Sequence, residues 1–197
     1  MRKIIMLLAC MTLLLTACGT EITEVPSKEL PIRYMNASYA IDIENPKEVV
    51  GFGDYVFVAK INEEIETEYR DVVEFKGKTI ATPYTVYSVT VIDNLKGKIK
   101  RNTPIEFEKF GGINMDNKSI SLLDGDELLE EGKYYILVAS AESNGKLTQI
   151  SPTSAIKLDG ESKDEIIFSE EYKAFKEFCK EEIKFERQRF ISKYEEG

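Results

Sequence analysis

Four short runs of β-branched and aromatic residues constrain the fold of this chain more than any other feature of its sequence. They cover residues 54–61, 84–92, 105–108 and 134–139, and polar or glycine-containing stretches separate them. Val, Ile, Tyr, Phe and Thr fit the pleated surface of a sheet, and runs of this length are typical of buried strands. The pattern therefore predicts a mainly β protein.

Turn signals predict how these strands connect. Lys76-Gly77-Lys78 predicts a hairpin turn inside the charged stretch 62–83. Asn144-Gly145 predicts a second hairpin, between strands at 134–141 and 146–151. We expect a type I′ turn there, which requires positive φ at both central residues.

Three other stretches have weaker patterns. Residues 32–43 fit a first strand, although the alternation slips at 36–38. The polar stretch 114–133 lacks a regular period and is predicted to be a loop, while residues 154–158 fit a short edge strand.

A short helix is predicted before the first strong strand. Asn45 can accept hydrogen bonds from first-turn N–H groups, Pro46 suits the first helical position, and Glu48 completes an arrangement like a capping box. Gly51 and Gly53 are expected to end this helix, since glycine tolerates a left-handed cap.

The C-terminal part of the chain changes to a helical period. Ser169 is expected to cap an amphipathic helix that runs to about Lys193. Its apolar residues recur at steps of three, four or seven, which favours packing against the barrel over binding a partner. The stripe comprises Phe168, Tyr172, Phe175, Cys179, Ile183, Phe190 and Tyr194.

The N-terminus indicates export. Arg2 and Lys3 precede an uncharged apolar stretch, residues 4–17, which is too short to span a bilayer and fits a signal peptide. Leu15-Thr16-Ala17-Cys18 resembles the lipobox of bacterial lipoproteins. The resemblance implies cleavage before Cys18, lipidation of its thiol, and a protein anchored to the cell membrane on the extracytoplasmic face. The alternative is an ordinary secretory signal.

Composition excludes several kinds of chemistry. The chain has 26 basic and 35 acidic residues, a formal net charge of −9, and no histidine. Histidine-dependent triads and metal sites are therefore excluded, and the acidic balance disfavours nucleic acid as a partner. With Cys10 in the signal and Cys18 lipidated, Cys179 is the only other thiol, and its place in the apolar stripe predicts an inert side chain.

Weaker candidate sites have simpler explanations. Ser154-Ala155-Ile156-Lys157 matches S-x-x-K, but the companion motifs of penicillin-recognising enzymes are missing. The oxygen-rich loop 114–131 lacks the spacing of a calcium site, so solvated turns explain it better. A basic cluster, Lys96, Lys98, Lys100 and Arg101, fits a solvated turn or contact with anionic wall polymer or lipid headgroups. We predict no catalytic, cofactor-binding or metal-binding residue.

A family resemblance covers residues 45–151. The short helix and first strand, then Tyr84-Thr85-Val86-Tyr87, Asn94-Leu95-Lys96-Gly97, Gly111-Gly112 and Glu131-Gly132-Lys133-Tyr134, follow one another as in the netrin-like, tissue-inhibitor-of-metalloproteinases type of OB-fold. The resemblance implies a Greek-key barrel of about five strands. The family's inhibitory mechanism needs a free N-terminal cysteine, which an acylated Cys18 would not supply.

These observations divide the chain into four parts. Residues 1–17 form the signal peptide, 18–44 a tether with a first edge strand, 45–158 the barrel, and 159–197 the helical segment. We expect a lipid-anchored, non-catalytic binding module of the cell envelope, whose partner is an envelope protein or wall polymer. The alternatives are a protease-inhibitor-like protein and a carboxylate-based envelope hydrolase.

Overall fold

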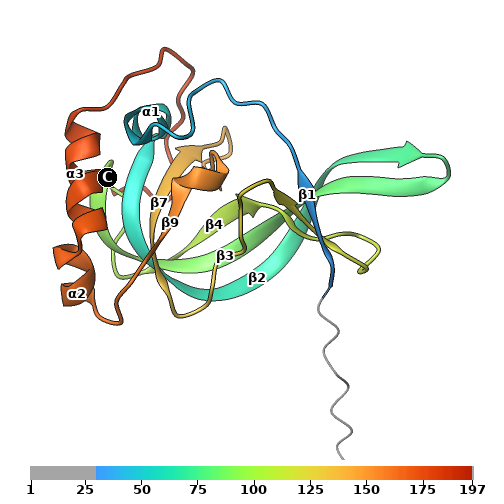
Figure 1. Ribbon diagram of the computed structural model, residues 1–197, viewed down its shortest axis with the longest axis horizontal. Coiled ribbons are helices and arrows are strands. Elements are labelled where there is room, and N and C mark those ends of the chain that lie inside the picture. Colours follow the sequence, from blue (N-terminus) through green and yellow to red (C-terminus); the bar gives the residue numbers. More distant parts are fainter. Residues whose placement is uncertain (1–29, 197) are drawn as a thin grey trace, which may run out of the picture.

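The computed structural model describes residues 30–196, so the predicted signal peptide, Cys18 and most of the tether lie outside the described residues. Most of the chain forms a strongly curved six-stranded sheet in the order β2-β3-β4-β8-β7-β9 (Figure 1). β2 pairs with both β3 and β7, so the sheet curls back on itself and is partly closed. All neighbours in it are antiparallel except β4 and β8. The mainly β prediction is confirmed.

The strands of this sheet are unequal in length. The two longest are consecutive and form one hairpin, whose turn is the predicted Lys76-Gly77. The bounds are β2 Tyr55–Phe75, β3 Lys78–Lys96, β4 Pro104–Phe110, β7 Tyr134–Ala141, β8 Leu147–Gln149 and β9 Ala155–Leu158. The last of these confirms the short edge strand predicted at residues 154–158, and it follows a 3₁₀ turn at Pro152–Ser154.

A second, smaller sheet lies beside the first in the order β1-β6-β5. β1, Ile32–Met35, confirms that residues 32–43 contain a strand, but it joins this small sheet and not the barrel. β5 is Gly112–Ile113, just before the predicted loop, and β6, Ile120–Leu123, corrects the prediction that 114–133 is a loop throughout. β6 takes up only four residues of that stretch. Its apolar residues, Ile120, Leu122 and Leu123, are too few to show a strand period against the polar residues on both sides.

Two hydrophobic clusters hold the sheet from either face. Inside the barrel, Phe57 and Phe107 meet edge to face with ring centroids 6.4 Å apart, and Tyr87 is buried with them. On the outer face, Val56 and Val58 pack towards the helices. Successive residues of β2 therefore bury opposite faces, which explains why residues 55–59 form an unbroken apolar run.

The first helix, α1, covers Pro46–Phe52 and begins as predicted. The Asn45 side chain accepts a hydrogen bond from the Lys47 N–H, and Pro46 is the first helical residue. Gly53 caps the end of the helix as predicted, but with an ordinary φ of −61° and not in the left-handed region, and Gly51 lies inside the helix instead of ending it. Gly51 is instead required by space, because a Cβ there would lie 2.0 Å from the carbonyl oxygen of Ile183.

The second predicted hairpin exists with a different turn. β7 and β8 pair across Asn144-Gly145, with Ala141 opposite Leu147. Only Gly145 has a positive φ, of 79°, so the turn is not type I′. At the other hairpin both Lys76 and Gly77 have positive φ, of 50° and 71°, as a type I′ turn requires.

The predicted long C-terminal helix is corrected. Two short helices form, α2 at Lys163–Phe168 and α3 at Glu170–Lys180, and the Ser169 side chain accepts from the Tyr172 N–H as expected. Tyr172 and Phe175 are buried against the outer cluster, so this part of the stripe packs on the fold. Residues 181–196 continue without helix, arching over α1 and returning along the barrel (Figure 1). No helix among residues 30–196 is long and apolar enough to cross a membrane.

Candidate ligand-binding groove and its surroundings

The distal end of the β2–β3 hairpin projects from the barrel as a two-stranded ribbon (Figure 1). We call residues 71–80 the arm, and every one of them is exposed. Val73 lies opposite Ile80 and Phe75 opposite Lys78, so these four side chains share one face of the ribbon. The opposite face carries Glu74 and Thr79, whose side chains are hydrogen-bonded to each other.

The apolar face of the arm is open to solvent. Phe75, Val73 and Ile80 are 57%, 54% and 48% exposed. A two-stranded ribbon on its own is marginally stable in water, and contiguous exposed apolar side chains mark interaction surfaces. The arm therefore has the properties of a docking element.

A cluster of charged side chains holds the base of the arm to the barrel. Arg70 binds the buried carboxylate of Glu108 on β4, and its Nη1 lies 3.0 Å from Oε1 of Glu142. Lys146 lies 2.6 Å from carboxylate oxygens of both Glu68 and Glu108. The hydrogen bond from Lys146 lowers the pKa of Glu68, with Arg70 adding to the effect. Burial alone would lower the pKa of Arg70, but the hydrogen bond and charge of Glu108 raise it above its usual range.

A groove of about 570 Å³ lies between the arm and the turn that joins β5 to β6. Its lining includes three cations, one carboxylate and two apolar side chains: Arg33, Lys78, Lys118, Asp116, Ile80 and Met115. Four residues of β3 line the groove, 78–81, and they lie beyond the part of β3 that pairs with β4. Within residues 30–196, no strand is paired with this edge of β3 there. The groove thus combines a locally positive charge with a free strand edge.

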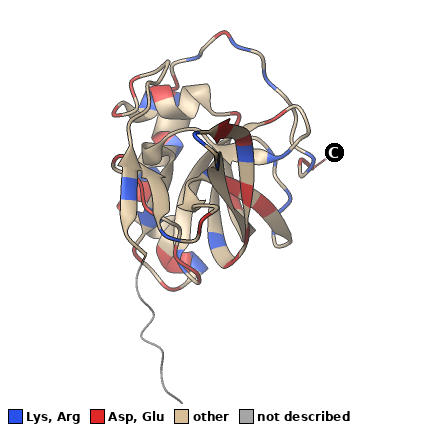
Figure 2. Cartoon of the chain, turned by 90° about the vertical axis from the view of Figure 1, so that its right-hand side faces the viewer, with Lys and Arg blue, Asp and Glu red and all other residues tan. Residues whose placement is uncertain are grey.

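The predicted basic cluster does not form a single patch. Lys96 donates to the carbonyl oxygens of Val50 and Gly53 at 2.7 and 2.8 Å and also binds Glu182. Arg101 lies 3.8 Å from Asp93. Viewed from the arm side, basic and acidic residues are interspersed over the molecule (Figure 2). The cations that do gather, in the groove, come from three separate segments of the chain, and for this reason they do not form a cluster in the sequence.

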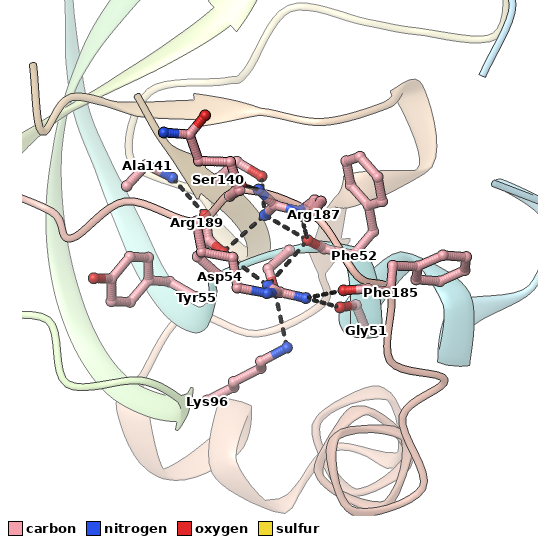
Figure 3. Close-up of polar contacts among 12 residues, drawn as sticks. Gly51, Phe52, Asp54, Tyr55, Lys96, Ser140, Ala141, Phe185, Arg187 and Arg189 are labelled. Carbon is pink, nitrogen blue, oxygen red and sulfur yellow. Dashed lines mark hydrogen bonds and ion pairs between the residues drawn. The ribbon is translucent and has the colours of Figure 1, made fainter. Parts of the chain in front are cut away.

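The densest polar contacts belong to residues 181–196, which we call the C-terminal segment (Figure 3). Arg187 donates to the carbonyl oxygen of Phe52 and to Oδ1 of Asp54, at 2.6 and 2.7 Å. Arg189 donates to the same Asp54 oxygen at 2.8 Å and to the carbonyl oxygen of Gly51 at 2.8 Å. These cations meet the carbonyl oxygens at the C-terminal end of α1, where the helix dipole favours positive charge.

The same segment continues along the barrel. The Tyr55 hydroxyl donates to Glu195 and accepts from the Ser192 N–H at 2.9 Å. Burial, followed by the hydrogen bond with Glu195, raises the pKa of Tyr55 to about 12. The Tyr194 hydroxyl donates to Oε2 of Glu106 at 2.9 Å. These contacts explain why no long helix forms, because an extended path brings the arginines to α1 and Asp54 and brings Tyr194 to Glu106 on β4.

A second, smaller hollow of about 130 Å³ lies near the predicted acidic loop. One of its lining residues, Asp126, is buried and bound to Lys109, which also donates to Oε1 of Gln149 at 2.8 Å. Burial lowers the pKa of Lys109. Asp116, from the same predicted acidic loop, lines the groove instead of this hollow. Among residues 30–196, no group of three or more His, Cys, Asp or Glu side chains is arranged to hold a metal ion.

The remaining sequence candidates are placed apart. The Ser154 hydroxyl is buried and donates to the carbonyl oxygen of Ser151 at 2.7 Å, whereas Lys157 pairs with Glu130 at the surface. The S-x-x-K match therefore does not assemble a nucleophile and a base. Cys179 is half-buried, and burial raises the pKa of its thiol to about 11, which disfavours the reactive thiolate.

A comparison with protein-family models finds no match, and a comparison with curated proteins finds no significantly similar sequence. The functional interpretation therefore depends on the geometry of the chain itself. The sequence predicted the hairpin turn of the arm at Lys76-Gly77-Lys78, but it did not predict that the ribbon projects from the sheet or that a groove lies beside it. The sequence did not show that the arm stays exposed among residues 30–196.

Proposed function

We propose that this chain is a lipid-anchored, non-catalytic binding module of the bacterial cell envelope. Cys18 would carry the lipid, and the groove beside the arm would hold an anionic segment of an envelope partner, either a wall polymer or a protein. The observation that carries the proposal is the groove itself, in which Arg33, Lys78 and Lys118 face one carboxylate in a chain of net charge −9. A local excess of cations in an acidic protein favours an anionic ligand.

The strand order supports an OB-fold assignment within this proposal. If the strands β2, β3, β4, β7 and β8 are numbered one to five in chain order, their order in the sheet is 1-2-3-5-4. Strand four (β7) also pairs with strand one (β2), and strands three and five (β4 and β8) are parallel. OB-folds bind ligands on the face of their second and third strands and on the loops after the first and fourth. The arm and the Glu142–Gly145 turn occupy those two loop positions. An OB-fold by itself does not imply a function, so the support for the proposed function comes from the side chains of the groove.

Photo-crosslinking in intact cells tests the groove. A photoreactive residue at Met115, which lines the groove, is expected to capture a specific envelope component. The same residue at Ile191, 76% exposed on the C-terminal segment, is the matched control and should not capture it. Reversing the groove charge with Lys78→Glu and Lys118→Glu should abolish capture. Equal capture from both positions, or capture that survives charge reversal, would reject the proposed ligand site.

The anchor is tested separately. Cys18→Ala should abolish labelling of the protein by a fatty-acid probe, and labelling that is unchanged would refute lipidation at this residue. The carboxylate-hydrolase alternative is less well supported, because the groove is lined by the single carboxylate Asp116. A paired-carboxylate mechanism needs two, roughly 5–10 Å apart.

A further inference from the structure

We propose that the apolar face of the arm docks on the surface of the membrane to which Cys18 is anchored, with Phe75 inserted among the lipid headgroups. This inference rests on the proposed lipid anchor. Its occupant is a lipid surface rather than a protein, and it concerns the apolar face of the ribbon, of which Ile80 and Lys78 also line the groove.

The side-chain pattern of the arm fits an interface between water and lipid. Val73, Phe75 and Ile80 lie on one face, and Glu74 and Thr79 lie on the other. At the turn, Lys76 stacks on Phe75 with its Nζ 5.2 Å from the ring centroid, and Lys78 stands directly opposite Phe75. Segments that lie in the membrane interface combine an apolar face with aromatic and lysine residues in this way, and lysines near anionic headgroups contribute favourable electrostatics.

The length of the tether keeps the arm within reach of the bilayer. Cys18 precedes Leu30, the first described residue, by about 12 positions, so an extended chain spans at most about 40 Å. β1 begins at Ile32, and Arg33 in β1 lines the same groove as Lys78 and Ile80 of the arm. The chain therefore enters the fold beside the arm, and the tether holds this side of the molecule near the lipid.

The tether also raises the effective concentration of the arm at the membrane surface, which a weak contact needs. A single apolar tip gives marginal membrane affinity, and a second linked attachment converts that contact into an intramolecular one. The lipid on Cys18 would be the first attachment and the arm the second. Two attachments would fix the orientation of the barrel and turn the groove towards the space next to the bilayer.

The absence of tryptophan from the sequence provides a direct probe. Phe75→Trp places a unique indole at the tip of the arm. The chain from residue 18 onwards, with Cys179→Ser, can be coupled through the Cys18 thiol to maleimide lipids in vesicles of phosphatidylcholine with phosphatidylglycerol. On coupling, the emission of the indole at position 75 should shift to the blue, and brominated lipids should quench it. Phe168→Trp, at a residue that is 69% exposed on α2, is the matched control and should show neither change.

One further variant and one control without vesicles separate lipid docking from other events. Lys76→Glu with Lys78→Glu, in the Phe75→Trp background, should reduce the shift on vesicles that contain phosphatidylglycerol. No shift on coupled vesicles would overturn the inference, as would the same shift without vesicles at high protein concentration, which would indicate a second copy on the arm. Because coupling here is chemical, these outcomes do not depend on whether Cys18 is lipidated in cells.

Discussion

The arm and the C-terminal segment are opposites in how they are held. The arm is a paired two-stranded ribbon with Val73 opposite Ile80, interrupted by a register shift between Arg70 and Val73, yet each of residues 71–80 is exposed. The C-terminal segment has no helix or strand, yet Arg187 and Arg189 hold it to Asp54, and Tyr55 binds it through Ser192 and Glu195. The contrast teaches that regular hydrogen bonding and tertiary attachment are separate properties, and that substitutions should affect the two regions in opposite ways.

The largest effect is expected from Asp54→Ala. The Asp54 side chain is 6% exposed and accepts from both arginines and from the Ala141 N–H, so its loss leaves two cations and one N–H without their carboxylate acceptor. Removing one side of such a buried pair costs about 3–5 kcal/mol of unfolding free energy. Urea denaturation measures the loss, and Asp124→Ala, at an exposed aspartate, should change stability by less than about 0.5 kcal/mol. Equal effects of the two variants would contradict the attachment described for the C-terminal segment.

Glu108→Gln should have the next largest effect, because it loosens the base of the arm. Glu108 is 1% exposed and compensates Arg70 and Lys146, both of which remain partly exposed. We expect a loss of about 2–3 kcal/mol, in line with hydrogen bonds to charged groups. Amide hydrogen exchange should also become faster in residues 71–80. Glu66→Gln, at an exposed glutamate of the same strand as Arg70, is the control, and unchanged exchange in the Glu108 variant would mean that the arm does not depend on this cluster.

Gly51→Ala tests the contact between α1 and the C-terminal segment. Alanine favours a helix over glycine, but the new Cβ would lie 2.0 Å from the carbonyl oxygen of Ile183. We expect a net loss of about 1–3 kcal/mol from overpacking, together with faster proteolysis after residue 181. A variant that is more stable than the wild type would show that the segment does not pass over Gly51.

Acidification should weaken both regions modestly. Hydrogen bonds from Lys146 lower the pKa of Glu68 at the base of the arm, and those from Lys193 and Tyr194 lower the pKa of Glu106 beside the C-terminal segment. A carboxylate with a lowered folded-state pKa stabilises the fold above its unfolded pKa and loses this contribution as pH falls through the folded value. Stability should therefore decrease below about pH 4.3, by no more than about 1 kcal/mol for each of these partly exposed groups. Urea midpoints between pH 3 and 8 measure this decrease, and a steep change between pH 5 and 8 would contradict it, since the chain has no histidine.

The smallest effect on stability is expected from the arm itself. Replacing Val73, Phe75 and Ile80 together by serine removes apolar surface that is already exposed. The unfolding free energy should change by no more than about 0.5 kcal/mol, while the tip loses its lipid contact. A loss of several kcal/mol in thermal or urea unfolding would show that the arm packs against another part of the chain.

Sequence reasoning found the elements whose signals are local. The Asn45-Pro46 helix start, the Lys76-Gly77 turn and the strand at Tyr134–Ala141 are each specified by neighbouring residues, and the structure confirms them. The C-terminal helix was extended too far because the spacing of Ile183, Phe190 and Tyr194 fits a helix as well. What ends it is a set of partners in α1 and β2, more than 130 positions away along the chain.

The candidate groove depended still more on distant contacts. Arg33, Lys78 and Lys118 come from three segments that no periodicity links. The acidic loop likewise divides in space, with Asp126 buried against Lys109 and Asp116 at the groove. Local patterns report propensity and burial, whereas a site assembled from separate segments follows from sheet pairing, which the sequence encodes only through long-range contacts.

The path of the C-terminal segment has a consequence for the order of events during biosynthesis. Asp54 and Tyr55, at the start of the first strand of the six-stranded sheet, obtain their partners from residues 187–195, more than 130 positions later in the chain. Contacts of such long sequence separation form slowly, because the loop between them must be closed first. The six-stranded sheet, whose last strand ends at Leu158, can therefore pair before residues 187–195 have been synthesised, and the contacts at Asp54 and Tyr55 are added after it.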